Sequence, residues 1–258
     1  MTTAVKALRL PAVAELMFSK LAWVPTEKQL PILACMKRQI LVSGGEQSGK
    51  SAVAAKYMLM RLPEVLEKTL YWLVAADYDK TKREFEYLAD DLERLGLLIS
   101  RTKRVDPGVI EFLPEGSRIE TKSASDPRSL AMTAPQGILV CEASQVDYTT
   151  YMKCRARIAP SRGWLFMSGT MEGSLGWFPS LVGKWALGLN DCQSFRLPST
   201  SNTHIYPGGE KDPEILRLKA DSSDEFFMER IMGVPVPPRG LVFQEFRVDY
   251  HVSDVEFD

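Results

Sequence analysis

The sequence is poor in cysteine, in net charge and in long apolar runs. Its four cysteines, at positions 35, 141, 154 and 192, form no CxxC pair and lack the spacing of a metal site, which favours a reducing environment over a disulfide framework. No apolar segment approaches the roughly 20 residues of a membrane span. The first 18 residues resemble a short amphipathic helix broken by Pro11 rather than a signal peptide. We therefore expect a soluble, globular protein without membrane association.

Positive and negative side chains nearly cancel. The chain has 32 Lys and Arg against 33 Asp and Glu, a formal net charge of −1. This balance argues against nonspecific nucleic-acid binding by the whole surface, although a local basic face stays open. With 258 residues, 45% of them hydrophobic, the chain can form one large core or a core with a small subdomain.

Four short apolar runs alternate with segments whose apolar residues recur at helical spacing. The runs are RQILVSGG, TLYWLVAA (69–76), GILVCEAS (137–144) and GWLFMSGT (163–170). This order predicts an α/β fold with a mostly parallel central sheet flanked by helices. The charged segment DKTKREFEYLADDLERLG predicts a helix that Gly96 closes. GVIEFLPEGSRIETKSA alternates apolar and polar residues around a Pro-Glu-Gly turn, which predicts an antiparallel hairpin.

The residue composition of the chain changes at about residue 196. From there it is rich in turn-forming residues and carries two short acidic segments of helical character. We expect a small lid or linker subdomain over 196–258, and the α/β core over 1–195.

A glycine-rich loop, GGEQSGKS, follows the first apolar run and fits the pattern G-x-x-x-x-G-K-[ST]. In that pattern backbone N–H groups wrap a phosphate, and the next helix adds its positive N-terminal end. Lys50 would reach the β and γ phosphates of a nucleoside triphosphate, and the Ser51 hydroxyl would hold Mg²⁺. An ordinary glycine turn is the alternative, but the flanking strand and helix favour a nucleotide site. The expected binding residues are Gly44, Gly45, Glu46, Gln47, Ser48, Gly49, Lys50, Ser51 and Ala52.

The third apolar run ends in Cys141 and Glu142. A carboxylate at the exit of a buried strand is costly unless it is paired or functional. In nucleotide hydrolases such residues help to hold Mg²⁺ or polarise the attacking water. We predict that Glu142 is catalytic and, with Ser51, belongs to the metal site; a glutamate that simply reaches solvent is the alternative. Cys141 is a poor ligand for a hard cation, so the metal would rely on Ser51, phosphate oxygens and water.

These motifs together resemble the ATPase domain of the large terminase subunit of tailed bacteriophages, the motor that packs DNA into the capsid. GGEQSGKS resembles the Walker A loop of the family and ILVCEAS its Walker B strand. FMSGT is similar to the coupling motif, in which Ser168, Gly169 and Thr170 would sense the lost γ-phosphate and move the lid. WVPTEKQLPIL is similar to the segment in which Gln29 would contact the adenine edge. The stretch from STSNTHIYPGG to GLVFQEF is similar to the Thr…Asn…Pro segment and the link to a nuclease domain.

The resemblance implies a P-loop NTPase of the RecA/ASCE type, with the adenine segment inside 1–195. It implies an ATP hydrolase that uses Mg²⁺ and couples hydrolysis to translocation of double-stranded DNA into the procapsid. Its partners would be double-stranded DNA, the portal protein and the small terminase subunit. Assembled copies would form a homo-oligomeric ring, with a monomer in isolation, in the host cell cytoplasm and docked transiently at the portal vertex. Nuclease activity would belong to a region beyond residue 258, and the acidic residues near that end are more typical of a solvated tail than of a metal cluster.

Two features depart from the family pattern. Cys141 stands where the family has the Walker B aspartate. The places that often carry an arginine finger, in the glycine loop and shortly before the Walker B strand, contain Glu46-Gln47 and the residues 130–132. Arg128 is the nearest substitute, with Arg155 and Arg157 as alternatives; a solvated or DNA-facing arginine is equally consistent with each.

The basic stretch SRTKRVDPG supplies candidates for gripping DNA, because a motor that holds duplex of any sequence contacts phosphates with Lys and Arg. The candidates are Arg101, Lys103 and Arg104, with Lys80, Lys82 and Arg83 nearby. A solvated helix and loop whose charges balance neighbouring carboxylates is the alternative. Two other functions stay open: a helicase-like DNA translocase, for which the chain lacks room for a second RecA-like domain, and a nucleotide-gated binding module without turnover.

Overall fold

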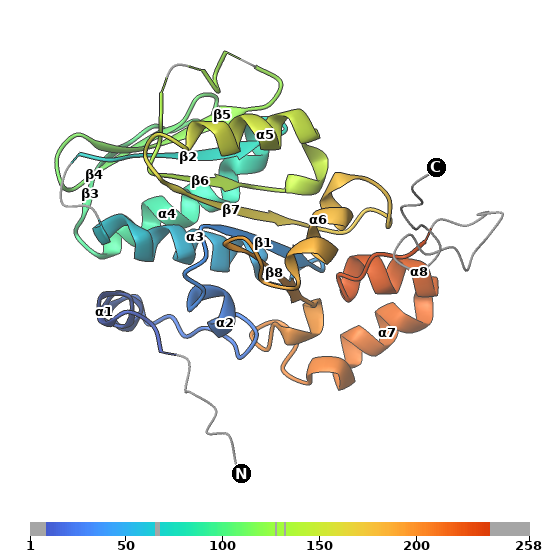
Figure 1. Cartoon of the computed structure of the whole chain (residues 1–258). Helices are drawn as coiled ribbons and strands as arrows, with labels where there is room; N and C mark the ends of the chain where they lie inside the picture. Colours follow the sequence, from blue (N-terminus) through green and yellow to red (C-terminus); the bar gives the residue numbers. More distant parts are fainter. Residues whose placement is uncertain (1–8, 65–67, 127, 132, 238–258) are drawn as a thin grey trace, which may run out of the picture.

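The computed structural model describes residues 9–64, 68–126, 128–131 and 133–237, and its centre is one eight-stranded sheet (Figure 1). The strands are β1 (Gln39–Gly44), β2 (Leu70–Ala75), β3 (Leu98–Arg101), β4 (Val109–Phe112), β5 (Ser117–Ser123), β6 (Gly137–Val140), β7 (Trp164–Gly169) and β8 (Cys192–Leu197). Their spatial order is β3-β4-β5-β2-β6-β7-β1-β8. Neighbours from β5 to β8 run parallel, and β4 is antiparallel to both β3 and β5. The mostly parallel sheet that the sequence predicts is confirmed.

Helices cover both faces of this sheet. They are α1 (Ala12–Lys20), α2 (Leu30–Leu33), α3 (Lys50–Arg61), α4 (Lys82–Arg94), α5 (Tyr148–Arg157), α6 (Trp177–Trp185), α7 (Pro213–Asp221) and α8 (Asp224–Phe226). In Figure 1, α3 and α4 lie below the sheet and α5 lies above it. One apolar core joins the sheet to α1–α4 and a second joins it to α5 and α6. Ile40 and Leu41, adjacent on β1, belong to opposite cores, as expected of a strand buried on both faces.

The predicted hairpin and the predicted end of the charged helix are both confirmed. β4 and β5 pair around the Pro-Glu-Gly turn. Gly96 has φ +73°, and its N–H donates to Glu93 O at 2.9 Å while the N–H of Leu97 donates to Leu92 O at 2.8 Å. This pair of bonds is the Schellman arrangement, which requires the left-handed backbone that glycine adopts readily.

Four elements, α2, β3, α6 and β8, were not predicted from the sequence. Within the described residues, β8 lies at the edge of the sheet and pairs only with β1, so its residues are not uniformly buried and its apolar signal is weak. α6 contains Pro179 and Gly183, two residues with poor helix propensity. Within the described residues, no helix combines the length and the apolar character that spanning a bilayer requires.

Residues 199–233 form a small helical unit with its own apolar cluster, which contains Tyr206, Ile215, Phe227 and Ile231. The two predicted acidic helices are α7 and α8, the second continued by a π-helical turn, η6 (Phe227–Ile231). Figure 1 shows α7 and α8 at the lower right, beside the main body. The division at residue 195 stays a prediction, and residues 240–258, the predicted start of a nuclease, lie outside the described residues.

Candidate functional site

The glycine loop connects the carboxyl end of β1 to the first turn of α3. Gly49 has φ +86°, a left-handed backbone that glycine adopts readily and other residues adopt only with strain. A Cβ on Gly45 would clash with the backbone of Ile231 and with Ser199. Within the described structure the buried hydroxyl of Ser48 has no hydrogen-bond partner. A loop this enclosed, with an unpaired hydroxyl, suits a phosphate oxygen.

The helical unit at 199–233 forms hydrogen bonds with the backbone of the glycine loop. The side chain of Asn202 donates to Gln47 O at 2.7 Å, and the Ser199 hydroxyl donates to Glu46 O. The N–H of Glu46 donates to Arg230 O at 2.6 Å, and the Arg230 guanidinium lies 3.8 Å from the Glu46 carboxylate. The loop and this unit are therefore joined by several direct bonds, so displacement of one strains the other.

Lys50 and Glu142 meet above the loop. Lys50 Nζ lies 3.6 Å from Glu142 Oε1 and donates to Gly45 O at 3.4 Å. Glu142 follows β6 with φ +46° and ψ 53°, a left-handed backbone that costs a non-glycine residue roughly 1–2 kcal/mol. Such an outlier points to a functional constraint. The structure thus brings together the predicted lysine and the predicted catalytic acid.

A second carboxylate, which the sequence analysis did not select, reaches the same place from α4. Glu84 is 3% exposed. Burial raises its pKa and hydrogen bonds from Ser51 and Cys141 oppose this rise, while the charge of Glu142 adds to it. Burial, with a smaller effect of Glu84, raises the pKa of the Cys141 thiol well above its usual value. The thiol therefore stays protonated at neutral pH and is no thiolate ligand.

The predicted coupling motif ends β7, the strand between β6 and β1. Ser168 pairs in register with Val42 of β1, and Gly169 pairs with Ser43. A Cβ on Gly169 would lie 2.9 Å from the backbone nitrogen of Ser144, in the turn that follows Glu142. Ser168 and Thr170 are buried. The motif therefore lies between the glycine-loop strand and the turn after Glu142.

A cavity of about 240 Å³ opens over the loop. The predicted residues that line it are Gln29, Gln47, Ser48, Gly49, Lys50, Ser51, Ala52 and Glu142. The lining residues that the sequence analysis did not predict for this cavity are Trp23, Arg83, Tyr87, Asn202, His204 and Ile205. Three of these carry flat rings, which can stack on another planar ring. They come from separate segments of the chain, so no local pattern could identify them.

Gln29 lies beneath the loop, and both ends of its amide contact backbone groups. Its oxygen accepts from the N–H of Thr26 at 3.0 Å, and its nitrogen donates to Gly49 O at 3.4 Å. The side chain is 4% exposed and lines the cavity. Contact with an adenine edge stays a prediction.

The predicted arginine-finger candidates lie apart from this cavity. Arg128 is 95% exposed at its side chain and lies 3.6 Å from Asp126. Arg155 and Arg157 are in the last turn of α5. Among the described residues that line the cavity, the only arginine is Arg83, on α4. Its position next to Glu84 makes it a further candidate for contacting phosphate.

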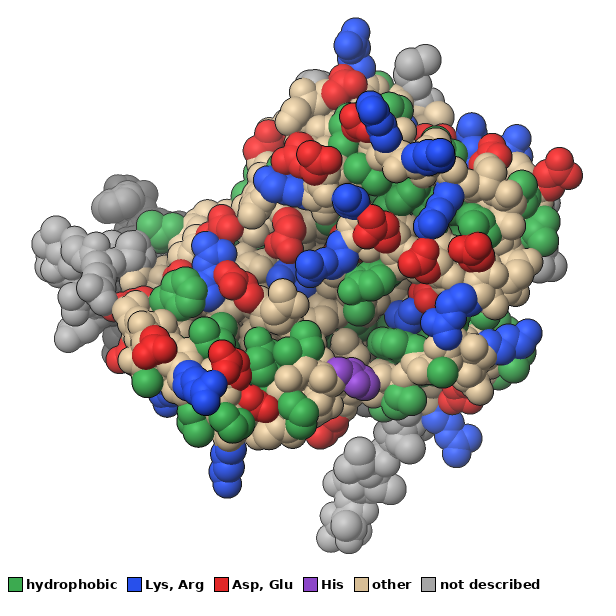
Figure 2. Space-filling model, turned by 180° about the vertical axis from the view of Figure 1, so that it is seen from behind, with side chains coloured by type: hydrophobic (Ala, Val, Ile, Leu, Met, Phe, Trp, Pro, Cys, Tyr) green, Lys and Arg blue, Asp and Glu red, His purple; other side chains and the backbone are tan. Residues whose placement is uncertain are grey.

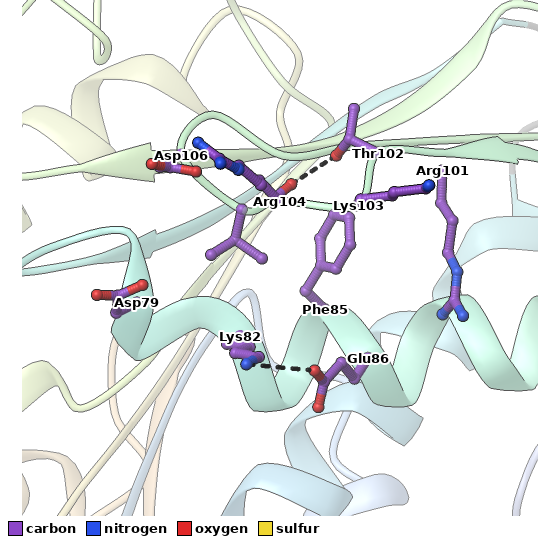
Figure 3. Close-up of a pocket in the computed structure, with 10 residues that line it drawn as sticks. Asp79, Lys82, Phe85, Glu86, Arg101, Thr102, Lys103, Arg104 and Asp106 are labelled. Carbon is purple, nitrogen blue, oxygen red and sulfur yellow. Dashed lines mark hydrogen bonds and ion pairs between the residues drawn. The ribbon is translucent and has the colours of Figure 1, made fainter.

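The basic stretch lines a second, larger cavity of about 710 Å³, together with Lys82, Phe85 and Glu86 of α4 (Figure 3). Arg101 lies 2.9 Å from Asp90, and Lys82 lies 4.0 Å from Glu86. Within the described residues, neither Lys103 nor Arg104 forms an ion pair. Figure 2 shows acidic and basic side chains intermingled over one face of the molecule. The basic groups are thus partly balanced by carboxylates, and Lys103 and Arg104 are the best placed to contact an anion.

In the part of the chain that the structure describes, no three His, Cys, Asp or Glu side chains gather as a metal-binding group. The oxygen donors at the cavity over the loop include instead the Ser51 hydroxyl and the Glu142 carboxylate. Oxygen donors of this kind fit Mg²⁺, which usually keeps several waters and takes its other ligands from substrate phosphates. The residues present therefore fit a magnesium ion that arrives with a nucleotide.

The sequence matches no protein-family model and no curated protein. Among solved structures, the large terminase ATPase domain of Thermus phage P74-26 is 18% identical with a TM-score of 0.69, over 85% of this chain and 97% of that one. The large terminase of a thermophilic bacteriophage, in complex with ADP, is 16% identical with a TM-score of 0.69, over 88% of this chain and 57% of that one. The bacteriophage HK97 large terminase is 12% identical with a TM-score of 0.62, over 88% of this chain and 51% of that one. The chain therefore has the fold of the ATPase domains of phage large terminases, and the expected α/β fold class is confirmed.

Proposed function

We propose that this chain is the ATPase motor domain of a phage large terminase, which hydrolyses Mg-ATP to drive double-stranded DNA into a procapsid. One observation carries the proposal: the glycine loop, Lys50 and Glu142 meet at one cavity, with Lys50 3.6 Å from the Glu142 carboxylate. The shared fold supports it, as do the structures of the thermophilic bacteriophage large terminase with ADP and with ATP-γ-S. This chain spans little more than half of that protein and of the HK97 protein, so functions of the remaining parts, nuclease activity included, concern a longer protein.

The loop and the start of α3 bind the phosphates. Backbone N–H groups and the positive end of the 12-residue helix α3 attract them, and the Ser48 hydroxyl donates to a phosphate oxygen. Lys50 contacts the β and γ phosphates, and Ser51 holds the magnesium ion. That ion neutralises charge on the β and γ phosphates when bound. Gln29 and the rings around the cavity position the base.

Glu142 acts as the general base. A γ-phosphate at the loop competes with Glu142 for Lys50, which frees the carboxylate to take a proton from the attacking water. Ser168, Gly169 and Thr170 then transmit loss of the γ-phosphate between β1 and the turn after Glu142. The unit at 196–258 serves as the lid, because Ser199 and Asn202 bond to the loop backbone.

DNA is gripped through Arg101, Lys103 and Arg104, in a cavity whose lining residues differ from those of the nucleotide cavity. The assembled motor is a homo-oligomeric ring in the host cell cytoplasm, docked at the portal protein and served by the small terminase subunit. An arginine finger completes the site, with Arg128 as the first candidate. Because such fingers contribute about 10³-fold or more, a monomeric domain hydrolyses ATP slowly if its finger comes from a neighbour.

The nucleotide assignment is tested with Lys50→Ala. We expect the wild-type chain to bind a fluorescent ATP analogue and to release phosphate from ATP only with Mg²⁺, and the variant to lose both activities. Lys153→Ala, which removes an exposed lysine on α5, is the control and should behave as wild type. Unchanged ATP affinity and hydrolysis in Lys50→Ala would refute the assignment. Tight binding without turnover in the wild type, at every protein concentration, would instead favour the nucleotide-gated binding module.

The DNA assignment is tested by reversing Arg101, Lys103 and Arg104 to Glu together. Binding of double-stranded DNA should weaken strongly and lose much of its salt dependence, because phosphate contacts release counterions, while ATP binding stays unchanged. Reversal of Lys211, Arg217 and Lys219, in and near α7, makes the same change in net charge and serves as the control. Equal loss in the two variants would mean that overall charge, and not this cavity, governs DNA binding.

A further inference from the structure

We propose that Arg83 is a phosphate-binding residue of the nucleotide site, whose guanidinium contacts the phosphate chain of ADP or ATP held by the same chain. The inference rests on the proposed function, because it names a further contact of that nucleotide. An arginine finger stabilises the transition state of hydrolysis. Arg83 differs from such a finger, because it contacts the nucleotide before any chemistry takes place.

The first observation is the cavity that Arg83 lines. It lies at the cavity over the glycine loop, which is also lined by Lys50 and Ser51. Tyr87, four residues further along α4, lines the same cavity, and residues four apart on a helix share a face. Lys82, the residue before Arg83, lines instead the cavity of the basic stretch. The helix therefore presents Arg83, and not Lys82, to the nucleotide.

The second observation is the position of Arg83 along α4. The helices α3 and α4 follow strands that run parallel in the sheet, and they pack on the same side of it, so they point in the same direction (Figure 1). An ion pair between Lys56 and Asp91 fixes their alignment. At 1.5 Å per residue, Lys50 lies about 9 Å before Lys56 and Arg83 about 12 Å before Asp91. Arg83 is therefore nearly level with the lysine of the glycine loop.

The third observation is that the charge of Arg83 is not matched by another group of the protein. Within the described residues, its guanidinium forms no ion pair and no hydrogen bond. The other two cations of α4 do have partners: Lys82 lies 4.0 Å from Glu86, and Arg94 donates to Leu21 O at 2.8 Å. The one cation of this helix that lines the nucleotide cavity is thus the one without a partner.

The charges around the cavity leave Arg83 available to an anion. Lys50, the other Lys or Arg of the lining, lies 3.6 Å from Glu142, so these two charges offset each other. Arg83 is exposed, and a charge in contact with water carries little desolvation cost before a ligand binds. A guanidinium presents five donors in a rigid fork that matches phosphate oxygens. A phosphate chain at the glycine loop is the ligand that fits this arrangement.

The test measures how much of the nucleotide affinity depends on Arg83. We would titrate a fluorescent ADP analogue with the wild type and with Arg83→Gln in the presence of Mg²⁺. The analogue would then be displaced with ADP and with adenosine, which has no phosphates. A hydrogen bond to a charged group corresponds to about tenfold or more in affinity. We therefore expect ADP to bind about tenfold more weakly to Arg83→Gln, and adenosine to bind equally to both proteins.

Two further variants separate a specific contact from overall charge. Arg217→Gln removes an exposed arginine on α7 and should leave the affinity for ADP unchanged. Arg83→Lys keeps the charge but loses the fork, so it should recover part of the affinity. The gap between the wild type and Arg83→Gln should narrow as the salt concentration rises, because salt screens exposed charges. Urea denaturation should give the same midpoint for both proteins, since Arg83 has no side-chain partner in the described structure.

The outcomes distinguish the inference from the function on which it rests. A wild type that binds no ADP would overturn the proposed function and this inference with it. A wild type that binds ADP, with Arg83→Gln equal to it, would overturn the inference alone. An equal loss in Arg217→Gln would do so as well, because net charge would then explain the effect. A loss for adenosine as large as that for ADP would place the action of Arg83 on the base or on the fold, and would also overturn the inference.

Discussion

Two acids on one face of α4 are buried to the same extent but have different partners. Glu84 is 3% exposed and Asp91 is 4% exposed, and they are two helical turns apart. Asp91 lies 2.5 Å from Nζ of Lys56 on α3, and that lysine also stands over the ring of Trp23. Glu84 has no ion-pair partner among the described residues, and burial is the largest cause that raises its pKa. One helix therefore carries a buried acid that is paired with a lysine and, two turns earlier, a buried acid without an ion-pair partner among the described residues.

The two acids differ in the groups that oppose the cost of burying their charge. Burial is the main cause that raises the pKa of both acids. At Asp91, the hydrogen bond and charge of Lys56 oppose that rise, so the protein itself supplies the counter-charge. At Glu84 the opposing groups are neutral. Within the described residues, a lysine therefore compensates the charge of Asp91, and no cation compensates that of Glu84.

Removal of Lys56 should cause the largest loss of stability. Lys56→Met leaves Asp91 buried without a cation, and breaking a buried pair from one side costs about 3–5 kcal/mol. Urea denaturation of the protein at neutral pH would measure this loss in the free energy of unfolding. Burial raises the pKa of Asp91 even beside Lys56, and loss of the lysine raises it further. The loss should therefore shrink as pH falls, where Asp91 is protonated in both proteins, and grow as pH rises above the raised pKa of the wild type.

The double variant Lys56→Met with Asp91→Leu is the control for this change. It removes both charges, and it should recover most of the lost free energy of unfolding, since apolar replacements of buried pairs are often neutral or stabilising. A loss below about 1 kcal/mol in Lys56→Met, the level of a surface pair, would mean that Asp91 has access to water or to another cation.

Glu142→Gln tests the third carboxylate, which is half-buried at the mouth of the site. The amide keeps the shape but cannot take a proton, so ATP hydrolysis should slow at least about 10²-fold with nucleotide affinity retained. Steady-state phosphate release and equilibrium binding of the ATP analogue would show the two effects separately. Near-normal turnover would transfer the catalytic role to another acid, with Glu84 as the first to examine.

Glu84→Gln should have an opposite effect on stability from Lys56→Met. Without nucleotide and Mg²⁺, the neutral amide relieves an uncompensated buried charge, so the free energy of unfolding should stay equal or rise by about 1–2 kcal/mol. The same urea titration measures it beside Asp91→Asn, which should lose stability because Lys56 then lacks its partner. A loss above about 2 kcal/mol in Glu84→Gln would show that the Ser51 and Cys141 bonds stabilise the fold itself.

The sequence predicted the parts of the fold whose physical signal is local. β1, β2, β6 and β7 are buried on both faces and therefore appear as continuous apolar runs. The edge strand β8 lacks that signal, and α6 is obscured by Pro179 and Gly183. The order of the strands is not visible in the sequence: β7 lies between β1, which precedes the glycine loop, and β6, which precedes Glu142.

The residues of the candidate site also fall into two groups, those that a local sequence pattern identifies and those that only the tertiary fold brings together. Lys50, Ser51 and Glu142 belong to short patterns and could be chosen from the sequence. His204 and Asn202 lie on a turn-rich segment, and only the tertiary fold brings them to the loop. Glu84 is an intermediate case, because it shares the buried stripe of α4 with Phe85, Leu88 and Asp91. An acid at an apolar position of a helical pattern is a detectable signal, but its partners at 51 and 141 are not.

The smallest expected effect concerns Asp147, an acid that is exposed to solvent, whereas Glu84 is buried. Asp147 caps α5, and its carboxylate accepts from the N–H of Thr150 at 2.6 Å. That backbone bond lowers its pKa from the ordinary 3.8, opposite to the direction at Glu84. Asp147→Ala should cost about 1 kcal/mol, the usual loss for an N-cap, and Asp147→Asn should cost less because the amide oxygen still caps.

The pH dependence of this loss would show whether burial decides the direction of such shifts. A lowered pKa means that the charged cap contributes stability above about pH 4 and that this contribution is lost as pH falls through the lowered pKa. The difference in unfolding free energy between wild type and Asp147→Asn should therefore be constant near neutral pH and shrink in acid, as measured by urea denaturation at several pH values. A difference that grows toward acid pH would mean that the Thr150 bond does not favour the charged carboxylate, and that exposure to water is not what separates Asp147 from Glu84.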